Sequence, residues 1–493
     1  MVVVALATRL PAFGNPVPEF DEQLYSLIGA QMGRGLVPYA ELWDRKPPGL
    51  FLIYAAAHWL GGDGPVAYQL PALGVCLIGG WQVWRLALHL TDRRTAALAA
   101  PLYPALMAVF DSFSGQSEIF FAPLLMAMAQ ALLAARARAL RAARHFCLLA
   151  MACGGIALQV KYTVLAQCLF FGVCALWLLR AKGRRPAGLT FDAATFAMLG
   201  VAPTLLAAAW FAWAGALDDF IFANFLSIGR RATMPVGWLL NEQLIFAVPV
   251  VALATGGIAC ALAARRRGEP PAHLWWLALA WLGMAIAGLF MVRTIYTYYF
   301  GALVPATILV SLPLFDGRSR WGRAAWTVVL AGMLAGFNPV ERFTNTQRGH
   351  ATIARLTAVI APHVGARSHC LYVFDGPTAL YRLTGSGLPT RFIYPDHLNN
   401  VLEASALPVD PAGEVARIFA ERPGVVITSP DKVTPQNPAT NAVVARELAA
   451  HYRPLGQWIV QERPLDLHVR LPDSDGHAPQ CRLRPGGPAA GWE

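Results

Sequence analysis

Long apolar segments separated by short polar loops dominate the first two thirds of the chain. We expect membrane spans where such a segment approaches the roughly 20 residues that cross a bilayer. These segments are 65–90, 95–110, 118–135, 145–160, 161–179, 190–214, 241–264, 273–292, 298–315 and 323–337. The apolar run that begins at Met1 is too short for a span, so we expect that a first helix has lost its start. The pattern predicts about eleven transmembrane helices.

One further apolar segment, 50–60, lies between Pro47-Pro48 and a Gly-Gly pair. Its dozen residues suit a helix that lies in the membrane interface better than a span. If it does not cross, and a tight turn near Gln159 joins two spans, five short basic loops share one face. They contain Arg93 and Arg94; Arg136, Arg138, Arg141 and Arg144; Lys182, Arg184 and Arg185; Arg265 to Arg267; and Arg318, Arg320 and Arg323. The positive-inside rule makes this face cytoplasmic, so a large first loop, 11–64, and everything after Phe337 are expected in the periplasm.

The last third of the chain changes character, with frequent Pro, Gly and Asp residues between short elements. Residues 370–374 and 425–428 read as strands and 458–471 as a hairpin, whereas 349–360, 411–421 and 438–450 read as helices. We therefore expect a transmembrane domain at 1–337 and a soluble α/β domain at 338–493, whose tail after Asp473 is disordered. The expected fold class is a mainly α, polytopic membrane protein with a small periplasmic α/β domain.

Composition agrees with a membrane protein, since 56% of the residues are hydrophobic and only 14% are charged. The formal net charge of +11 comes from short basic runs between apolar segments, so we expect no nucleic acid partner. Six of the eight cysteines lie in apolar segments. The other two, Cys370 and Cys481, could form a disulfide in an oxidising compartment or remain free thiols.

The most concentrated chemistry lies in residues 20–49, where acids and bases gather beside apolar helices. Asp21 and Glu22 could act as a general base toward an incoming hydroxyl, although a solvated loop acid is the plainer reading of either residue alone. Asp44, Arg45 and Lys46 precede a double proline that begins a helix. Cations at a helix start suit a phosphate, and the alternative is that they extend to lipid headgroups.

Four further groups are candidates. Glu118 opens a span and is either a second site acid or a helix-capping residue. Lys161 interrupts a long uncharged stretch, which is costly in a membrane unless a turn brings it to the surface. Arg230, followed by Arg231, could clamp a phosphate. Tyr298 and Tyr299 could position a substrate or belong to an interfacial aromatic belt.

Some motifs are missing. The sequence has no phosphate-binding glycine-rich loop, no DxD pair for a nucleotide sugar and no histidine pattern with ligand spacing. Since nucleotides are not available outside the cytoplasm, a sugar donor used on the outer face has to be linked to a lipid.

These residues resemble a known family. Asp21-Glu22, the run from Pro38-Tyr39 to Asp44-Arg45-Lys46-Pro47-Pro48-Gly49, Glu118, Lys161 and Tyr298-Tyr299 are similar to the GT-C glycosyltransferases of the protein O-mannosyltransferase and lipid A aminoarabinose-transferase type, glycosyltransferase family 39-like. The likeness covers roughly residues 17–310. It implies a GT-C fold and transfer of a sugar, with inversion, from a polyprenyl phosphate to an acceptor hydroxyl on the periplasmic face of the bacterial inner membrane. The chain departs from many relatives in its short first helix and in Tyr298, which stands where they have His.

The resemblance implies that Asp21 and Glu118 are the acids of the first two outer loops and that Lys46 binds the donor phosphate. The full expected site adds Glu22 as a catalytic acid, Arg45, Lys161 and Arg230 at the phosphate, and Tyr39, Asp44, Tyr298 and Tyr299 as substrate-positioning residues. No cofactor is required. A divalent ion between Asp21, Glu22 and Glu118 is left open, since the lysines could replace it.

The expected partners are a polyprenyl-phosphate-linked sugar, membrane lipids and an acceptor that is a lipid, a glycan or a protein. The rival interpretation is a lipid or glycolipid transporter or flippase. Transporters usually place charges at the membrane midplane and often contain repeated halves, whereas here the charges gather at one surface and no repeat is visible.

Overall fold

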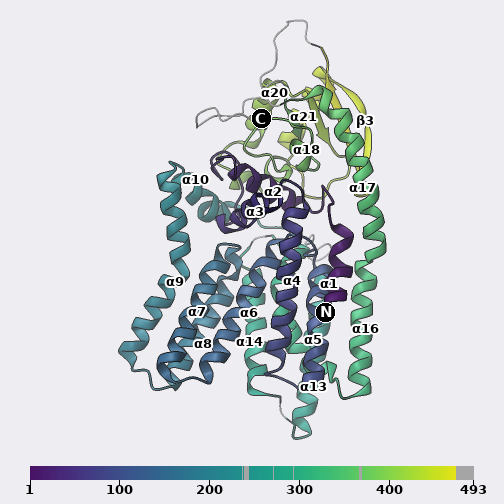
Figure 1. The fold of residues 1–493 in the computed structure, drawn as a ribbon. Coiled ribbons are helices and arrows are strands. Elements are labelled where there is room, and N and C mark those ends of the chain that lie inside the picture. The colour runs from purple at the N-terminus through teal and green to yellow at the C-terminus, as the bar shows by residue number, and fades with distance from the viewer. Residues whose placement is uncertain (236, 238–243, 270, 293, 366–368, 473–493) are drawn as a thin grey trace.

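The computed structural model describes residues 1–235, 237, 244–269, 271–292, 294–365 and 369–472. A bundle of long helices forms its lower part and a small α/β domain its upper part, with α2 and α3 between them (Figure 1). The mainly α fold with a C-terminal sheet domain is as predicted.

Seven helical stretches of the described residues are long and apolar enough to cross a membrane by length and composition. They are Val66–Ala87 (α4), Ser117–Arg136 (α6), Leu140–Leu158 (α7), Tyr162–Ala181 (η2 and α8, Leu165–Ala181), Pro186–Trp213 (α9), Leu244–Arg266 (η5 and α13, Val248–Arg266) and Thr297–Phe315 (η6, Thr297–Leu303; α15, Val304–Ser311; η7, Leu312–Phe315). The other predicted spans are helices too: α1 (Val2–Arg9) with η1 (Leu10–Ala12), α5 (Arg93–Val109), α14 (His273–Leu289) and α16 (Arg320–Phe337). The apolar pattern thus located the helices of the bundle.

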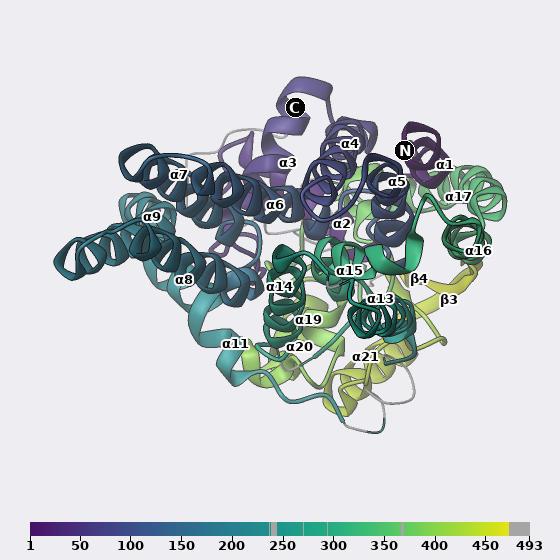
Figure 2. The same ribbon diagram turned by 90° about the horizontal axis from the view of Figure 1, so that it is seen from below.

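The five basic loops join helices at the end of the bundle that is farthest from the α/β domain (Figure 1). Seen from below, α7, α8 and α9 extend to one side of the remaining helices (Figure 2). Many apolar side chains of α9 are exposed, including Phe191, Leu206 and Trp213. A helix that shows so much apolar surface is stable when lipid surrounds it.

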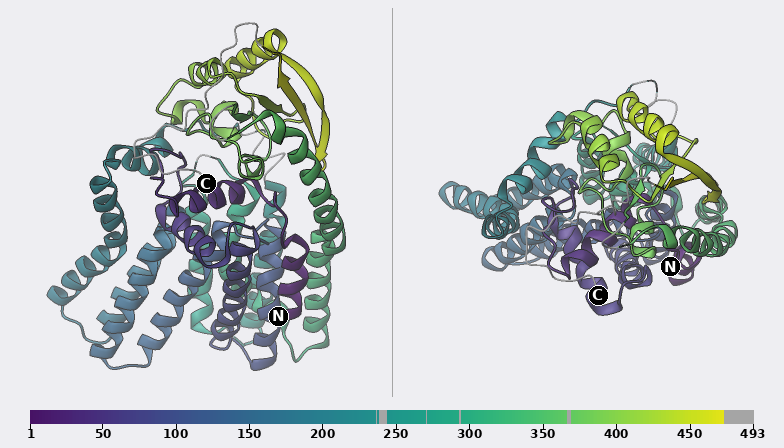
Figure 3. Two further views of the ribbon diagram at one scale, coloured as in Figure 1. Left: turned by 45° about the horizontal axis from the view of Figure 1, so that its top comes forward. Right: turned by 90° about the horizontal axis from the view of Figure 1, so that it is seen from above.

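Two shorter helices lie between bundle and domain: α2 (Phe20–Met32) and α3 (Pro48–Gly61). As expected for 50–60, α3 does not run through the bundle. The two helices cross closely, because a Cβ at Gly29 would lie 2.6 Å from Cβ of Tyr54. The C-terminal domain covers them from above (Figure 3), so α2 is buried on nearly all sides. The long α2–α3 connection, with its charged residues, is thereby enclosed.

Beyond Asn338, α17 (Pro339–Ile360) leads from α16 into the C-terminal domain. The sheet has the order β1-β2-β4-β3, with β1 parallel to β2 and the other pairs antiparallel. The strands are β1 (Leu371–Val373), β2 (Val425–Thr428), β3 (Tyr452–Val460) and β4 (Arg463–Arg470). All were predicted, but β3 starts earlier than expected because it follows α21 directly.

Short helices accompany this sheet. They are α18 (Ala379–Leu383), α19 (Pro395–Asn399), α20 (Pro411–Ala420) and α21 (Pro438–His451). The predicted helices at 411–421 and 438–450 are confirmed. Cys370 is buried, whereas Cys481 and the tail after Asp473 lie outside the described residues. The segment from Arg391 to Glu403, which includes α19, reaches down toward α2 and contributes to the site.

Candidate functional site

A cavity of about 310 Å³ lies where the bundle, the α2–α3 connection and the C-terminal domain meet. Its lining includes Glu19, Asp21, Asp44, Arg45, Lys46, Gln116, Lys161, Tyr162, Ile228, Arg231, Val292, Tyr296, Tyr298, Tyr299, Asp375, Tyr394, Asp396, His397, Glu403, Thr434 and Arg463. Seven of the eleven residues predicted for the site line this cavity: Asp21, Asp44, Arg45, Lys46, Lys161, Tyr298 and Tyr299. Segments far apart in the sequence therefore form one site.

Asp21 lies in the first turn of α2 and is buried. Its Oδ2 lies 3.4 Å from Nζ of Lys46 and accepts a hydrogen bond of 2.9 Å from the Tyr25 hydroxyl. Its Oδ1 accepts a hydrogen bond of 2.9 Å from Tyr394, which belongs to the C-terminal domain. Because a carboxylate oxygen can accept two hydrogen bonds, Oδ1 retains a position for a substrate hydroxyl.

The surroundings keep both Asp21 and Lys46 charged. Burial alone would raise the pKa of Asp21, but Lys46 and the hydrogen bonds from Tyr25 and Tyr394 outweigh it and lower that pKa to about 2. Burial would lower the pKa of Lys46, but Asp21 and Asp44 raise it above its ordinary value. At neutral pH the site thus holds a carboxylate and an ammonium in contact.

Tyr39 supports the Lys46 loop without lining the cavity. Its φ of 68° is an uncommon conformation for a residue other than glycine, and its hydroxyl donates a 2.8 Å hydrogen bond to the carbonyl oxygen of Lys46. Its ring packs against Phe211 and Phe220. Tyr39 therefore fixes the backbone that carries Lys46.

A close contact brings the Lys46 and Lys161 loops together. A Cβ at Gly49 would lie 2.7 Å from the carbonyl oxygen of Gln159, and the same oxygen accepts a 3.1 Å hydrogen bond from the Leu50 amide. Only glycine allows this approach. The tight turn predicted near Gln159 is present, and it places Lys161 at the cavity.

Lys161 is buried and forms an ion pair with Glu118. Its ammonium also lies 4.0 Å from the ring centroid of Tyr299 and 5.0 Å from that of Tyr298. Glu118 does not line the cavity. It therefore offsets the cost of burying Lys161, and the two tyrosines complete the cation's surroundings.

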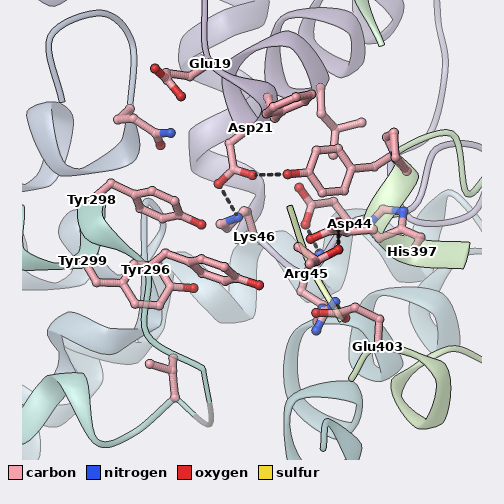
Figure 4. A pocket seen from close by; sticks show the side chains of 18 of the residues that line it. Glu19, Asp21, Asp44, Arg45, Lys46, Tyr296, Tyr298, Tyr299, His397 and Glu403 are labelled. Atoms are coloured by element: carbon pink, nitrogen blue, oxygen red, sulfur yellow. Dashed lines mark hydrogen bonds and ion pairs between the residues drawn. The ribbon is translucent and has the colours of Figure 1, made fainter. Parts of the chain in front are cut away.

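On the other side of the cavity, Glu403 of the C-terminal domain lies beside Arg45 (Figure 4), and it forms ion pairs with Arg45 and Arg231. Burial, followed by the nearby Arg231, lowers the pKa of Arg45 to about 10, so Arg45 remains cationic at neutral pH. Arg230, which was predicted as a phosphate ligand, is exposed, and its guanidinium lies over the Phe222 ring instead. Its neighbour Arg231 lines the cavity.

We expect Glu403→Gln to lower the free energy of unfolding by about 3 kcal/mol, because two largely buried arginines would lose their shared carboxylate. Thermal unfolding of the purified protein in detergent measures this effect. Glu447→Gln is the matched control, since Glu447 pairs with the exposed Arg446. Equal stability of the two variants would contradict the structural role of Glu403.

Asp44 and His397 are two further buried groups of the cavity wall. Oδ2 of Asp44 and Nδ1 of His397 have no hydrogen-bond partner within the described part of the chain. Burial and the neighbouring Arg45 and Lys46 lower the pKa of His397 well below its ordinary value, so its ring is neutral. Both atoms are buried, so they lie within the cavity wall and not at its surface.

Glu22, predicted as a catalytic acid, is fully buried and does not line the cavity. It belongs to a separate polar cluster with Arg9 and Ser114. Burial raises the pKa of Glu22 to about 7, although Ser114, Gly115 and Arg9 oppose that rise. Glu22 is therefore a buried acid of α2 that lies outside the cavity.

The raised pKa of Glu22 predicts a pH-dependent stability. Below pH 4.5 the side chain is protonated in both folded and unfolded chains; as the pH rises toward 7, the unfolded chain ionises first and the folded protein loses about 3 kcal/mol. Glu22→Gln should remove this loss, so its advantage in melting temperature over the parent grows between pH 5 and pH 8. Thermal unfolding in nanodiscs at both pH values tests this, and a difference that does not change with pH would contradict it.

The divalent ion that the sequence left open between Asp21, Glu22 and Glu118 does not fit the residues around Asp21. Lys46 already occupies the side of the carboxylate where a cation would bind, and neither Glu22 nor Glu118 lines the cavity. No group of three His, Cys, Asp or Glu side chains that could hold a metal ion is present in the described ranges. The mechanism proposed below therefore uses no metal ion.

Many residues of the cavity were not among those predicted for the site, and four of them make the contacts described above. Tyr394, His397 and Glu403 come from the C-terminal domain, and Arg231 was considered only together with Arg230. Arg231 carried a local signal, since it is the second residue of an arginine pair in an expected outer loop. The other three lie in an irregular segment with no local pattern that marks a site.

No protein-family model and no curated protein sequence matches this chain. Among solved structures, ArnT from Cupriavidus metallidurans bound to undecaprenyl phosphate is similar, with a TM-score of 0.63, 15% identity and coverage of 94% of this chain and 96% of that chain. The apo state of the same protein gives a TM-score of 0.61 with the same identity and coverage. The apo oligosaccharyltransferase of Archaeoglobus fulgidus gives a TM-score of 0.49 at 12% identity, with coverage of 87% of this chain and 69% of that chain. The likeness to ArnT extends over bundle and C-terminal domain together, and it shows that this chain has the GT-C glycosyltransferase fold.

Proposed function

We propose that this chain is a membrane glycosyltransferase that moves a sugar from a polyprenyl-phosphate donor to an acceptor hydroxyl, with inversion. The observation that carries the proposal is the cavity in which the Asp21 carboxylate faces Lys46, Arg45, Arg231 and Lys161. Sugar transfer from a phosphate needs both parts: a group that orients the attacking hydroxyl and cations that stabilise the departing phosphate.

The cations define the donor side of the cavity. Lys46 is in contact with Asp21, and Arg45 and Arg231 are held in place by Glu403. Apolar side chains of the same cavity, Ile228 and Val292, suit the first isoprene units of a lipid-linked donor. The undecaprenyl phosphate bound to the similar ArnT structure supports a donor of this class.

In the proposed step, the acceptor hydroxyl donates a hydrogen bond to Oδ1 of Asp21 and attacks the anomeric carbon. The new carbon–oxygen bond forms as the bond to the phosphate oxygen breaks, and the electron pair leaves with the polyprenyl phosphate. The proton passes to Asp21 and then to water. With a pKa of about 2, Asp21 is a weak base, so the proton moves late, after the hydroxyl has begun to bond to carbon.

The arrangement of the charges supports a periplasmic site in the bacterial inner membrane. The cavity and the C-terminal domain lie at one end of the bundle, and the five basic loops lie at the other. The positive-inside rule places those loops in the cytoplasm.

A transfer assay tests the proposal. The purified protein in nanodiscs is offered a panel of radiolabelled polyprenyl-phosphate sugars with total membrane lipid, glycans or proteins as acceptors, with and without EDTA. We expect label to move to one acceptor class, and to do so in EDTA. A folded protein that transfers nothing but moves labelled lipid between leaflets would be a flippase instead.

A further inference from the structure

A second chamber adjoins the catalytic cavity. It has a volume of about 420 Å³ and lies where α2 begins, where α16 meets α17 and where β3 turns into β4. Its lining includes Asn15, Glu19, Phe20, Phe113, Phe337, Asn338, Glu341, Arg342, Asn345, Gln461 and Glu462. Glu19 and Phe20 line both spaces, so the two meet at the residues that directly precede Asp21.

The lining combines side-chain amides and carboxylates with aromatic rings. The amides of Asn15 and Asn345 can each donate and accept hydrogen bonds, as paired sugar hydroxyls require. Phe113 and Phe337 close one side of the chamber: both rings are buried and pack against each other, and the Arg342 guanidinium lies 4.6 Å from each ring centroid. Asn345 is held by a 2.9 Å hydrogen bond to Glu462, which fixes its direction.

The charge of the chamber disfavours anions. Glu19, Glu341 and Glu462 line it, and Arg342 is its one cationic lining residue within the described ranges. Arg342 is already engaged, since it lies 3.9 Å from Asp111 and donates a 3.0 Å hydrogen bond to the Phe337 carbonyl. Burial, Asp111 and Glu22 raise the pKa of the Glu19 carboxyl well above its ordinary value, although Arg342 opposes that rise, so the negative charge of the lining comes from Glu341 and Glu462. A phosphorylated ligand would meet uncompensated negative charge here.

The position of Glu19 matches the direction from which an acceptor has to arrive. Figure 4 shows Glu19 on the opposite side of Asp21 from Lys46. Inversion requires the hydroxyl to attack the face of the anomeric carbon opposite to the phosphate. With the phosphate beside Lys46, the acceptor enters from the side of Glu19.

We propose that this chamber binds an uncharged carbohydrate as the acceptor, either a free glycan or the headgroup of a glycolipid, and presents its hydroxyl to Asp21. The inference rests on the proposed function for the identity of the reaction. It rests on the chamber alone for the class of ligand, which is neutral and rich in hydroxyl groups.

Binding by the full chain in nanodiscs tests this. The probes are a panel of neutral disaccharide and trisaccharide methyl glycosides, the same glycans carrying a phosphate monoester, and a neutral diglycosyl-diacylglycerol in the nanodisc, measured by saturation-transfer NMR and calorimetry. We expect at least one neutral glycan to bind and its phosphorylated form to bind about tenfold more weakly. Binding of the free glycosides indicates a soluble glycan, and binding of the glycolipid alone indicates a lipid headgroup.

Variants of residues that line the chamber test whether the glycan binds there. Glu19→Gln and Asn345→Ala should weaken the neutral glycan about tenfold. Asn345 lines only this chamber, so Asn345→Ala should leave the affinity for polyprenyl phosphate within about twofold, which also shows that it folds, and a melting temperature checks the folding of Glu19→Gln. Glu341→Gln, which removes a carboxylate from the lining, should in addition reduce the discrimination against the phosphorylated glycan, an effect that a purely structural role would not produce. Gln347→Ala, on the same helix but outside the lining, is the matched control and should change nothing.

Two results would overturn the inference: a preference for the phosphorylated glycans, or glycan binding that is the same in Glu19→Gln and Asn345→Ala as in the parent. Failure of the proposed function would look different. Glycan binding that depends on Glu19 and Asn345, without sugar transfer from any donor, would leave the chamber in place and contradict the transferase.

Discussion

Replacing Asp21 by Asn should lower kcat for sugar transfer by about a thousandfold, the usual contribution of a positioned base. The amide can still contact the acceptor, but it carries no charge to orient the hydroxyl and cannot take its proton. The affinity for polyprenyl phosphate should stay close to that of the parent, because the proposed phosphate site consists of Lys46, Arg45 and Arg231 and does not include the carboxylate.

Initial rates with saturating donor measure kcat, and binding of labelled polyprenyl phosphate measures donor affinity separately. The matched control is Asp63→Asn, which removes an exposed acid that lies 3.3 Å from Arg34 outside the cavity. Because Asp21 is buried beside Lys46, a melting temperature distinguishes lost chemistry from lost folding. Transfer at nearly the parent rate by a folded Asp21→Asn protein would rule out Asp21 as the acceptor-activating group.

The helices of the bundle were predictable because a membrane span is recognised by length and composition alone. The same reasoning excluded α3 as a span, since its apolar run ends at Gly61 and Gly62 after only a dozen residues. That exclusion mattered most: counting α3 as a span would have moved every later loop to the other face.

Residues of the cavity could be predicted from the sequence where they belong to the same short charged segment. Asp21 and Lys46 both belong to the charged region 20–49, and the fold brings them into contact. Arg230 and Arg231 also share one short stretch, but the sequence did not indicate which of the two arginines lines the cavity. The helix α11 (Ser227–Arg230) ends at Arg230, and the backbone of Arg231 is extended, with φ −60° and ψ 136°. That change of direction separates the two neighbouring side chains, and nothing in the sequence marks it.

The contribution of the C-terminal domain could not be predicted. Tyr394 reaches Asp21 from 373 positions further along the chain, and Glu403 reaches Arg45 in the same way. Each contact depends on how the irregular segment around α19 packs on α2, and such a segment has no periodic pattern to read. Glu22 shows the opposite case: it is adjacent to Asp21 in sequence but does not line the cavity, because successive residues of a helix point about 100° apart.

Lys46→Met should reduce kcat by about a hundredfold or more and weaken the binding of polyprenyl phosphate by about tenfold. In the proposed mechanism the ammonium contacts the phosphate in the ground state, but the phosphate gains charge as the bond to the sugar breaks, so the interaction is stronger in the transition state. Loss of a preorganised donor of this kind therefore lowers kcat more than it lowers affinity. Lys46→Arg should recover part of the rate, because it restores the charge without the same geometry.

The control for Lys46 is Lys182→Met, an exposed lysine at the opposite end of the bundle that donates hydrogen bonds to the carbonyl oxygens of Arg136 and Arg138. It should leave both kcat and donor affinity unchanged. The double variant Asp21→Asn with Lys46→Met tests whether both residues act on the same displacement. If they do, the loss in kcat of the double variant should be smaller than the two single losses combined. A Lys46→Met protein that binds donor weakly yet turns over at the parent rate would show that Lys46 only captures the lipid, and the stabilisation of the leaving phosphate would then belong to Arg45 and Arg231.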